Sequence, residues 1–271
     1  EDETVFVTYS CDDCVSELLI LTAKDVVPLE GLRLTFDNIA NVPVADPNSV
    51  SDWNTFFDLP ANGTAFTSLA VAGNEVSLYG GAGITVKAVA FFGSTAIVKV
   101  EDDAGVLVAI KNAAFLGATA VTDIVSTSVL TVGVAGQVGA FKGATSLVNL
   151  DLPNATTWLN DIADGTLQGC TSLVTLNVPA ATSLPNFFVA GCTSLTTMTA
   201  NNALSVGSNA FNGCTSLTTV NTSIAAAIQE YVFINCNALT TINLSSCTDF
   251  GGTTGDNNVF FGITGNTITI T

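Results

Sequence analysis

The sequence predicts a solenoid, in which short coils stack on one another, preceded by a small unit that mixes α and β structure. The first observation is a string, Phe211-Asn-Gly-Cys-Thr-Ser-Leu-Thr-Thr-Val220, that recurs in altered form along the chain. Its glycine marks steps of 24, 26, 26, 22, 22 and 22 residues, at Gly93, Gly117, Gly143, Gly169, Gly191, Gly213 and finally Asn235. A repeat of this length is typical of a solenoid.

The second observation is that this repeat is missing from the first third of the chain. We therefore expect residues 1–83 to form an N-terminal α+β cap or attachment unit, and residues 84–271 to form the solenoid with a C-terminal cap. The first coil of a solenoid would otherwise expose an apolar end, which gives such a unit a purpose. Alternating residues 267–271 predict a strand that forms the last coil or a terminal cap.

Short elements can be assigned within the N-terminal unit. Alternation over residues 32–36 predicts a half-buried strand, and Gly73-Asn74 predicts the turn of a hairpin. Residues 51–59 predict a short helix with Ser51 as its N-cap. Further upstream, residues 5–9 and 18–21 are apolar runs, the first of them of β type, on either side of Cys11-Asp-Asp-Cys14.

The third observation is that apolar residues keep fixed offsets from the repeated glycine. Two columns are aliphatic: Ile97, Val121, Leu147, Leu173, Leu195, Leu217 and Leu239, and three residues later Val100, Ile124, Leu150, Leu176, Met198, Val220 and Ile242. A third column is aromatic, with one leucine: Phe91, Phe115, Phe141, Leu167, Phe188, Phe211 and Phe233. We expect all three columns to point into the core, where stacked Phe side chains stabilise the fold by roughly 2 to 3 kcal/mol each.

Four of the seven cysteines occupy one repeated position. Cys170, Cys192, Cys214 and Cys236 are one repeat apart, and earlier repeats place Ser94, Ala118 and Ala144 there. Because small buried residues replace them, we expect these cysteines to be buried free thiols. Cys11 and Cys14 are expected to form a local disulfide or to be buried thiols. A zinc site is disfavoured there because the sequence contains no histidine.

Composition excludes several classes of function. The chain has 23 acidic and 6 basic residues, and no basic residue follows Lys142. Nucleic-acid binding is therefore not expected, because phosphates need Lys and Arg partners. No apolar run is long enough for a membrane-spanning helix, so no membrane insertion is expected. Without histidine, a phosphate-binding loop or a nucleophile motif, we expect no enzyme activity and no cofactor or metal.

The motif Ala-Phe-x-Gly-Cys-Thr-Ser-Leu-Thr-x-Val resembles the BspA-like, or Treponema-type, leucine-rich repeat. Residues 210–220 match best, and the resemblance covers about two thirds of the chain. It implies a leucine-rich-repeat solenoid with a short parallel β-sheet on one side and an irregular or short-helical convex side. It also implies a secreted or surface-displayed protein that serves adhesion or recognition, and no catalytic site. A looser similarity of residues 34–81 to segments that precede such repeats in proteins of bacteria and tailed phages adds a virion-associated alternative.

Residues that flank the inward position of each predicted strand should face solvent, because side chains alternate along a strand. In the last four repeats these outward residues are uncharged: Thr175, Asn177, Thr197, Thr199, Thr219, Asn221, Thr241 and Asn243. One interpretation is structural, since stacked Thr and Asn side chains can satisfy one another. The others are a recognition surface for glycan or protein, and the binding of ordered water or ice.

Two carboxylate clusters, Asp12-Asp13 and Glu101-Asp102-Asp103, are expected to be solvated surface charge, with calcium binding as the alternative.

The sequence as a whole predicts a non-enzymatic, extracellular or surface-displayed module that binds protein or carbohydrate on a cell surface. The main alternative is a structural or receptor-binding component of a phage virion, a tail or an extracellular filament, whose partners are copies of itself or a virion. Ice binding through the Thr and Asn rows is a minor alternative.

Overall fold

The computed structural model describes residues 4–6, 20–22, 31–44, 46–59, 63–161, 163–251, 258–261, 263 and 269–270. The chain divides into two compact units, Glu1–Glu30 and Gly31–Thr271. In the first unit, β1 (Thr4–Phe6) and β2 (Ile20–Thr22) overlap the two apolar runs and pair antiparallel. Cys11 and Cys14 lie outside the described residues, so the predicted disulfide stays a prediction.

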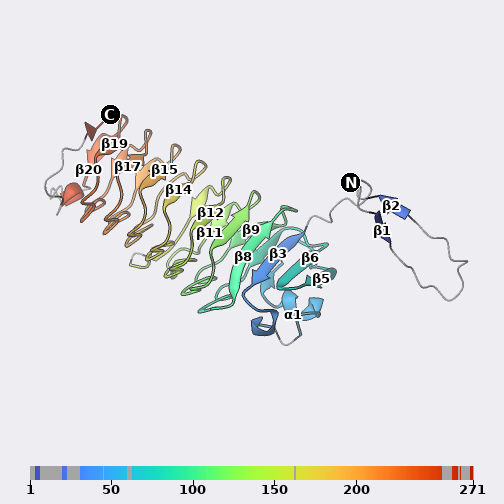
Figure 1. The fold of residues 1–271 in the computed structure, drawn as a ribbon. Coiled ribbons are helices and arrows are strands. Elements are labelled where there is room, and N and C mark those ends of the chain that lie inside the picture. Colours follow the sequence, from blue (N-terminus) through green and yellow to red (C-terminus); the bar gives the residue numbers. More distant parts are fainter. Residues whose placement is uncertain are drawn as a thin grey trace, which may run out of the picture. The chain divides into compact units, whose positions relative to one another are not determined.

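The second unit is a stack of coils (Figure 1). Every full coil has a strand on its first side, and all but the coil of β14 also have a strand on the second side. Strands on the first side pair parallel with the next coil, except between β12 and β14. They are β8 (Ile97–Asp102), β10 (Asp123–Ser126), β12 (Asn149–Asp151), β14 (Thr175–Asn177), β15 (Thr197–Thr199), β17 (Thr219–Asn221), β19 (Thr241–Asn243) and β21 (Thr269–Ile270). The strand predicted at residues 267–271 thus adds to the first side, beside β19.

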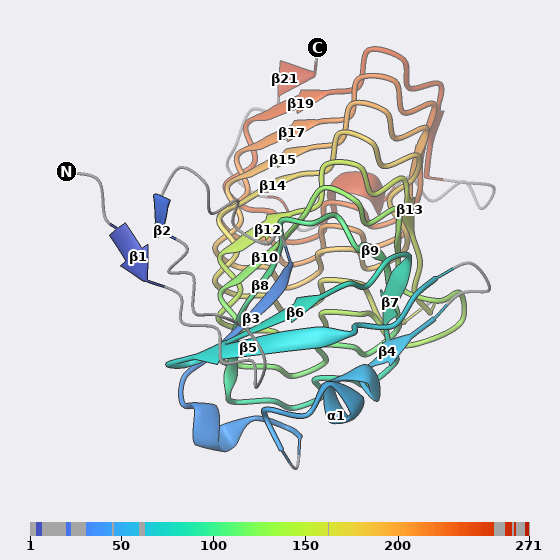
Figure 2. The same cartoon turned by 90° about the vertical axis from the view of Figure 1, so that its right-hand side faces the viewer.

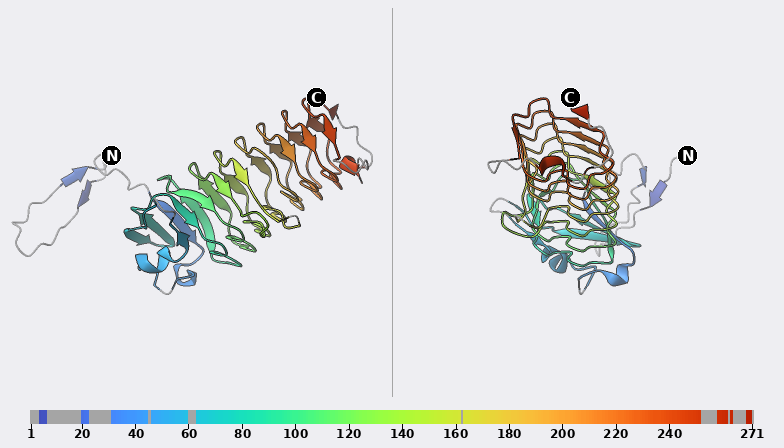
Figure 3. Two further views of the ribbon diagram at one scale, coloured as in Figure 1. Left: turned by 180° about the vertical axis from the view of Figure 1, so that it is seen from behind. Right: turned by 90° about the vertical axis from the view of Figure 1, so that its left-hand side faces the viewer.

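The second side carries shorter strands. They are β7 (Ile84–Val86), β9 (Leu107–Ile110), β11 (Thr131–Val132), β13 (Thr157–Trp158), β16 (Ser205–Val206), β18 (Ala227–Ile228) and β20 (Asp249–Phe250). Figure 3 shows the stacked coils from two further directions. The predicted solenoid is confirmed. Its second side is built from these short strands, where the resemblance implied irregular or short-helical structure.

Residues 31–83 add antiparallel structure to the first coil. Strand β3 (Leu32–Phe36) pairs with β8 on one edge and with β6 (Glu75–Tyr79) on the other. The predicted hairpin joins β6 to β5 (Ser68–Ala72), and β4 (Phe57–Asp58) pairs with β7. A 3-10 turn (η1, Ile39–Asn41) follows β3. The prediction of a domain boundary at residue 83 stays a prediction.

The helix of this region begins earlier than the sequence indicated. It is α1 (Val50–Asn54), and its N-cap is Ser49, whose side chain accepts a hydrogen bond from Asp52 N. The prediction of Ser51 as the cap is therefore wrong. Both serines precede suitable helical residues, but Ser49 Oγ accepts from the backbone N–H three residues later and also donates to the carboxylate of Asp52, which fixes it as the cap.

The solenoid consists of two blocks of coils, which we name by the repeated glycine. Both sides lack strand pairing at one level, between the coil of β12 and β13 and the coil of β14. At that level the step between repeats falls from 26 to 22 residues. Shorter coils cannot keep every residue in register with longer ones. We call the coils of Gly93, Gly117 and Gly143 block A, and those of Gly169, Gly191, Gly213 and Asn235 block B.

The predicted aliphatic columns fill the core, and each member is buried. The aromatic column needs one correction. Phe91, Phe115 and Phe141 stack with ring centroids 5.1 and 5.5 Å apart, and Phe211 stacks on Phe233 at 5.2 Å. Phe188 instead makes an edge contact with Trp158 at 5.3 Å. Val189, not Phe188, takes the column position, since it stands two residues before Gly191 as Phe211 stands before Gly213.

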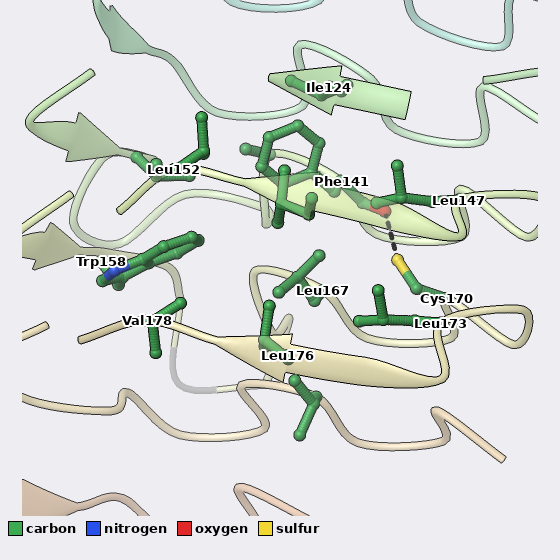
Figure 4. Packing of buried hydrophobic residues seen from close by; sticks show 14 of the residues in the cluster. Ile124, Phe141, Leu147, Leu152, Trp158, Leu167, Cys170, Leu173, Leu176 and Val178 are labelled. Carbon is green, nitrogen blue, oxygen red and sulfur yellow. Dashed lines mark hydrogen bonds between the residues drawn. The ribbon is translucent and has the colours of Figure 1, made fainter. Parts of the chain in front are cut away.

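The four repeated cysteines are buried free thiols, as predicted. Each Sγ donates a hydrogen bond to a backbone carbonyl of the preceding coil. Cys170 Sγ donates to Phe141 O at 3.2 Å, and Cys236 Sγ donates to Phe211 O at 3.1 Å. Figure 4 shows the first of these bonds among Leu147, Leu173 and Leu176. Burial raises the pKa of Cys170 and Cys214 well above the usual value, and raises the pKa of Cys236 to about 12.

Candidate functional site

Parallel pairing brings the eight predicted site residues into two straight rows on the first side of block B. Thr175, Thr197, Thr219 and Thr241 lie opposite one another on β14, β15, β17 and β19. Asn177, Thr199, Asn221 and Asn243 form the second row in the same register. The four strands follow one another in the stack in Figure 2. We call these eight residues the Thr/Asn face.

The backbone sets the direction of these side chains. Between the two rows, the central residue of each strand is buried in the core: Leu176, Met198, Val220 and Ile242. Because successive side chains point to opposite faces of a strand, the flanking residues point outward. Thr175 and Asn177 are exposed, and the other six are half-buried by their neighbours in the stack.

The hydroxyl groups of the Thr row have no hydrogen-bond partner among the described residues. Thr175, Thr197, Thr219 and Thr241 make no side-chain hydrogen bond to any described residue. The residues one position earlier behave differently: Thr196 Oγ1 donates to Val174 O at 3.1 Å, Thr218 to Thr196 O at 3.0 Å, and Thr240 to Thr218 O at 3.2 Å. The self-satisfied threonine ladder therefore lies beside the Thr/Asn face and not on it.

The second row is only partly satisfied. Asn243 Oδ1 accepts a hydrogen bond from Ser245 N at 3.3 Å. Asn221 Oδ1 is buried without a partner among the described residues. Sequence alone could not separate the bonded threonine hydroxyls from the unbonded ones, because Thr196 and Thr197, or Thr218 and Thr219, are the same residue type.

Charge is segregated along the first side. The strands of the Thr/Asn face carry no ionisable side chain, whereas the neighbouring β12 carries Asp151. Further into block A, Lys99 pairs with Asp123 at 3.7 Å and Arg33 pairs with Asp103 at 2.6 Å. In the described part of the chain each cation has an acidic partner, the remaining pairs being Lys87 and Lys111 with Asp58, and Lys142 with Asp164.

The prediction of solvated charge at residues 101–103 is wrong for Asp102. Its side chain is buried and accepts hydrogen bonds from Val106 N, Leu107 N and the hydroxyls of Ser126 and Ser128, all at 2.8 to 3.0 Å. It therefore ties β8, β9 and β10 together. The available signal was its offset, since Asp102 stands two residues after the inward Val100.

A groove that the sequence reasoning missed lies on the turns of block B. It has a volume of about 370 Å³ and is lined by Gln168, Gly169, Phe187, Ala190, Gly191, Asn212 and Gly213. The repeated glycines adopt left-handed backbone, with φ of 72° at Gly213, and Asn235 takes the same conformation with φ of 61°. Their missing side chains leave the groove floor open. The signal was the glycine repeat itself, which we read only as a turn.

The described residues contain no group of His, Cys, Asp and Glu side chains arranged to hold a metal ion. They also contain no helix with the length and apolar character needed to cross a membrane.

The geometry defines a solenoid protein with a repeated, uncharged polar face, and comparison with known families specifies the type of repeat. Residues 137–260 match the family model described as BspA type Leucine rich repeat region, in six copies. The resemblance inferred from the motif is thereby confirmed, and this part of the chain is a BspA-type leucine-rich-repeat region.

Solved structures to which this chain is similar include leucine-rich proteins from three organisms. The T. pallidum leucine rich repeat protein TpLRR is 17% identical over 72% of this chain and 82% of its own, with a TM-score of 0.37. A Bacteroides ovatus leucine-rich repeat protein is 16% identical over 68% and 58%, with a TM-score of 0.37. A Faecalibacterium prausnitzii protein described as a leucine rich cell surface protein is 13% identical over 79% and 92%, with a TM-score of 0.27. No curated protein sequence matches this chain.

Proposed function

We propose that this protein is a non-enzymatic recognition module, secreted or displayed on a surface, that binds a protein or a glycan through the Thr/Asn face. The observation that carries the proposal is the row of Thr hydroxyls that point outward, lie in register and make no hydrogen bond to the part of the chain that the structure describes. Each hydroxyl is both a donor and an acceptor, so the row offers a ligand many hydrogen bonds.

The class of protein supports the same role. Leucine-rich-repeat solenoids are typical non-enzymatic interaction scaffolds, and proteins with BspA-type repeats are often surface-displayed. In such a stack each coil contacts only its neighbours, which produces an extended regular surface suited to recognition.

The test replaces the central Thr row with bulky cations. A triple variant, Thr197→Lys, Thr219→Lys and Thr241→Lys, should lower binding of the labelled protein to glycan arrays and cell surfaces at least about tenfold, because lysine side chains cover the face and displace its hydrogen bonds. The matched control is Thr131→Lys, Ser205→Lys and Ala227→Lys, which adds the same charge to half-buried outward positions of the second side.

If binding falls equally in both variants, the added positive charge and not the loss of a specific site would explain the result. Binding that survives in the Thr/Asn-face variant would remove this face from the proposal. Circular dichroism of both variants checks that the solenoid is folded. Electron microscopy of the purified protein should show isolated particles, whereas fibres or ordered particles would favour the structural or virion-associated alternative.

A further inference from the structure

We infer that the ligand of the Thr/Asn face is a neutral, extended polysaccharide of the 1,4-linked β type, lying along the solenoid axis with one sugar residue per coil. This inference rests on the proposed function and narrows its ligand class. Three features of the face support it: its repeat distance, its lack of charge and its unused hydrogen-bonding groups.

The repeat distance of the face suits a linear polymer. Neighbouring strands of a parallel sheet are about 4.8 Å apart, so the Thr row presents one hydroxyl at each such step. The row runs over five strands, because Thr269 of β21 lies opposite Thr241. In an extended 1,4-linked β-glycan the sugars follow one another at a spacing close to that of the strands, and each sugar is turned over relative to the one before. Each coil would therefore meet one sugar, and every second coil would meet a sugar in the same orientation.

The second row gives each coil a further polar contact. Beside each Thr hydroxyl stands the amide or hydroxyl of the second-row residue two positions later on the same strand. Together the two rows offer donors and acceptors on every coil, and a sugar with several hydroxyls can use both kinds. The Thr methyl groups supply apolar contact for the C–H bonds of the ring.

The negative net charge of the protein favours an uncharged polymer over an anionic one as the ligand. The chain has a formal net charge of -17, and no basic residue follows Lys142. Sulfated or uronic-acid glycans would meet electrostatic repulsion and no compensating cation on the strands of the face. Asp151, exposed on the neighbouring β12, limits the neutral surface on the block A side.

Neighbouring threonines differ in what their hydroxyl groups would lose when a ligand binds. A ligand that bonds to Thr218 Oγ1 would have to break its hydrogen bond to Thr196 O, whereas Thr219 Oγ1 has no such bond to lose. Hydrogen bonds to the Thr row are therefore gained in exchange for water alone. The same holds for Thr197 and Thr241.

The experiment is calorimetric titration of the full chain with neutral β-1,4-linked gluco- and manno-oligosaccharides, from disaccharide to hexasaccharide. Affinity should rise with each added sugar until the oligomer spans β14 to β21, and then level off. The α-1,4-linked malto-oligosaccharides of the same lengths are the control, because their curved chains leave the straight row after a short contact.

Side-chain changes locate the binding. Thr197→Val, Thr219→Val and Thr241→Val each keep a β-branched residue in the strand but remove the hydroxyl, and each should weaken hexasaccharide binding about three- to tenfold. Thr131→Val on the second side should leave it unchanged. Absent binding, affinity that does not depend on length, or binding unaffected by the three substitutions would overturn the inference.

The two proposals fail in different ways. If the triple lysine variant loses binding to cells while no oligosaccharide binds the parent chain, the polysaccharide inference fails and the face recognises a protein or another glycan. If the triple lysine variant binds cells as well as the parent does, the proposed function itself fails.

Discussion

At the scale of single residues, one inward column contains three of the six buried polar side chains among the described residues: Asp102, Ser126 and Thr222. The position two residues after each central strand residue is occupied by Asp102, Ser126, Leu152, Val178, Ala200, Thr222 and Leu244, and all seven are buried. Asp102 and Ser126 bond to each other at 2.8 Å. Thr222, in contrast, has a buried Oγ1 with no partner among the described residues. A lone buried hydroxyl costs free energy because it gives up water without replacement.

The first prediction follows from Thr222. Thr222→Val removes the unpaired hydroxyl and keeps a side chain of similar shape, so it should raise the free energy of unfolding by about 1 kcal/mol. Thr218→Val is the control, because it removes a hydroxyl that donates to Thr196 O at 3.0 Å and should lower stability. Urea denaturation measures both. A loss of stability in Thr222→Val would mean that this hydroxyl has a partner.

The second prediction concerns pH. Burial raises the pKa of the Cys236 thiol from 9.0 to about 12, so between these values the unfolded chain loses a proton that the folded protein keeps. The free energy of unfolding should therefore be constant below about pH 9 and fall above it by up to about 1.4 kcal/mol per pH unit for this thiol. Cys170 and Cys214 add to the effect in the same direction.

Cys236→Ala should reduce this slope, and alanine fits the position because Ala118 and Ala144 are buried there in earlier coils. Guanidinium denaturation of both proteins at several pH values above about 8 gives the comparison. Equal slopes for the parent and the variant would contradict the assignment.

At the scale of the elements, the sequence predicted best those features that repeat or that depend on a short local pattern. The aliphatic columns, the hairpin at Gly73-Asn74 and the buried thiols were all predicted correctly because each depends on a local pattern of period or residue type. The helix cap and the position of Phe188 were not, because each required a choice between neighbouring residues of the same kind. Ser49 and Ser51 can be distinguished only once packing is known, whereas the fixed offset from Gly191 would have selected Val189 over Phe188 from the sequence.

For the candidate site, the sequence predicted which side chains point outward but not which of them are hydrogen-bonded. Outward orientation of the eight residues followed from strand alternation, and the structure agrees with it. Which threonine hydroxyls are used could not be predicted, because that depends on the carbonyl that each one meets in the coil before. The buried state of Asp102 was missed for a related reason, since the partners Ser126 and Ser128 belong to the next coil.

The third prediction tests the junction that Asp102 makes. Asp102→Ala leaves two backbone N–H groups and two serine hydroxyls without their acceptor, and should lower the free energy of unfolding by about 3 kcal/mol. Asp103→Ala, which removes only a surface ion pair with Arg33, should cost less than about 1 kcal/mol. Thermal and urea denaturation give both values. Similar losses in the two variants would show that the buried network does not matter.

At the scale of the molecule, we propose that residues 31–83 cap block A. Strand β3 pairs with β8 along its length, and Phe56 stacks on Phe91 of the first coil with ring centroids 5.5 Å apart. Leu32, Leu34 and Trp53 are fully buried in the same core. The terminal coil of a solenoid needs such cover to remain soluble.

The fourth prediction compares two deletions. Removal of residues 1–83 should yield protein that aggregates or loses its cooperative melting transition, because β8 and Phe91 would then be exposed to water. Removal of residues 1–30, which form a separate compact unit, should leave the solenoid monomeric and its melting temperature nearly unchanged. Size-exclusion chromatography and circular dichroism measure both. A monomeric, stable 84–271 fragment would rule out the capping role.

The interruption between the two blocks also has a mechanical consequence. At this level neither side carries strand pairing, and the coils are joined by turn contacts such as Gly143 N to Gln168 O at 2.8 Å and by the packed interior. Within block B, successive coils are joined through the strands as well. A pulling force along the axis would therefore separate block A from block B before it opened either one. The solenoid would separate at this junction. The Thr/Asn face lies wholly on block B, so its strands would stay paired.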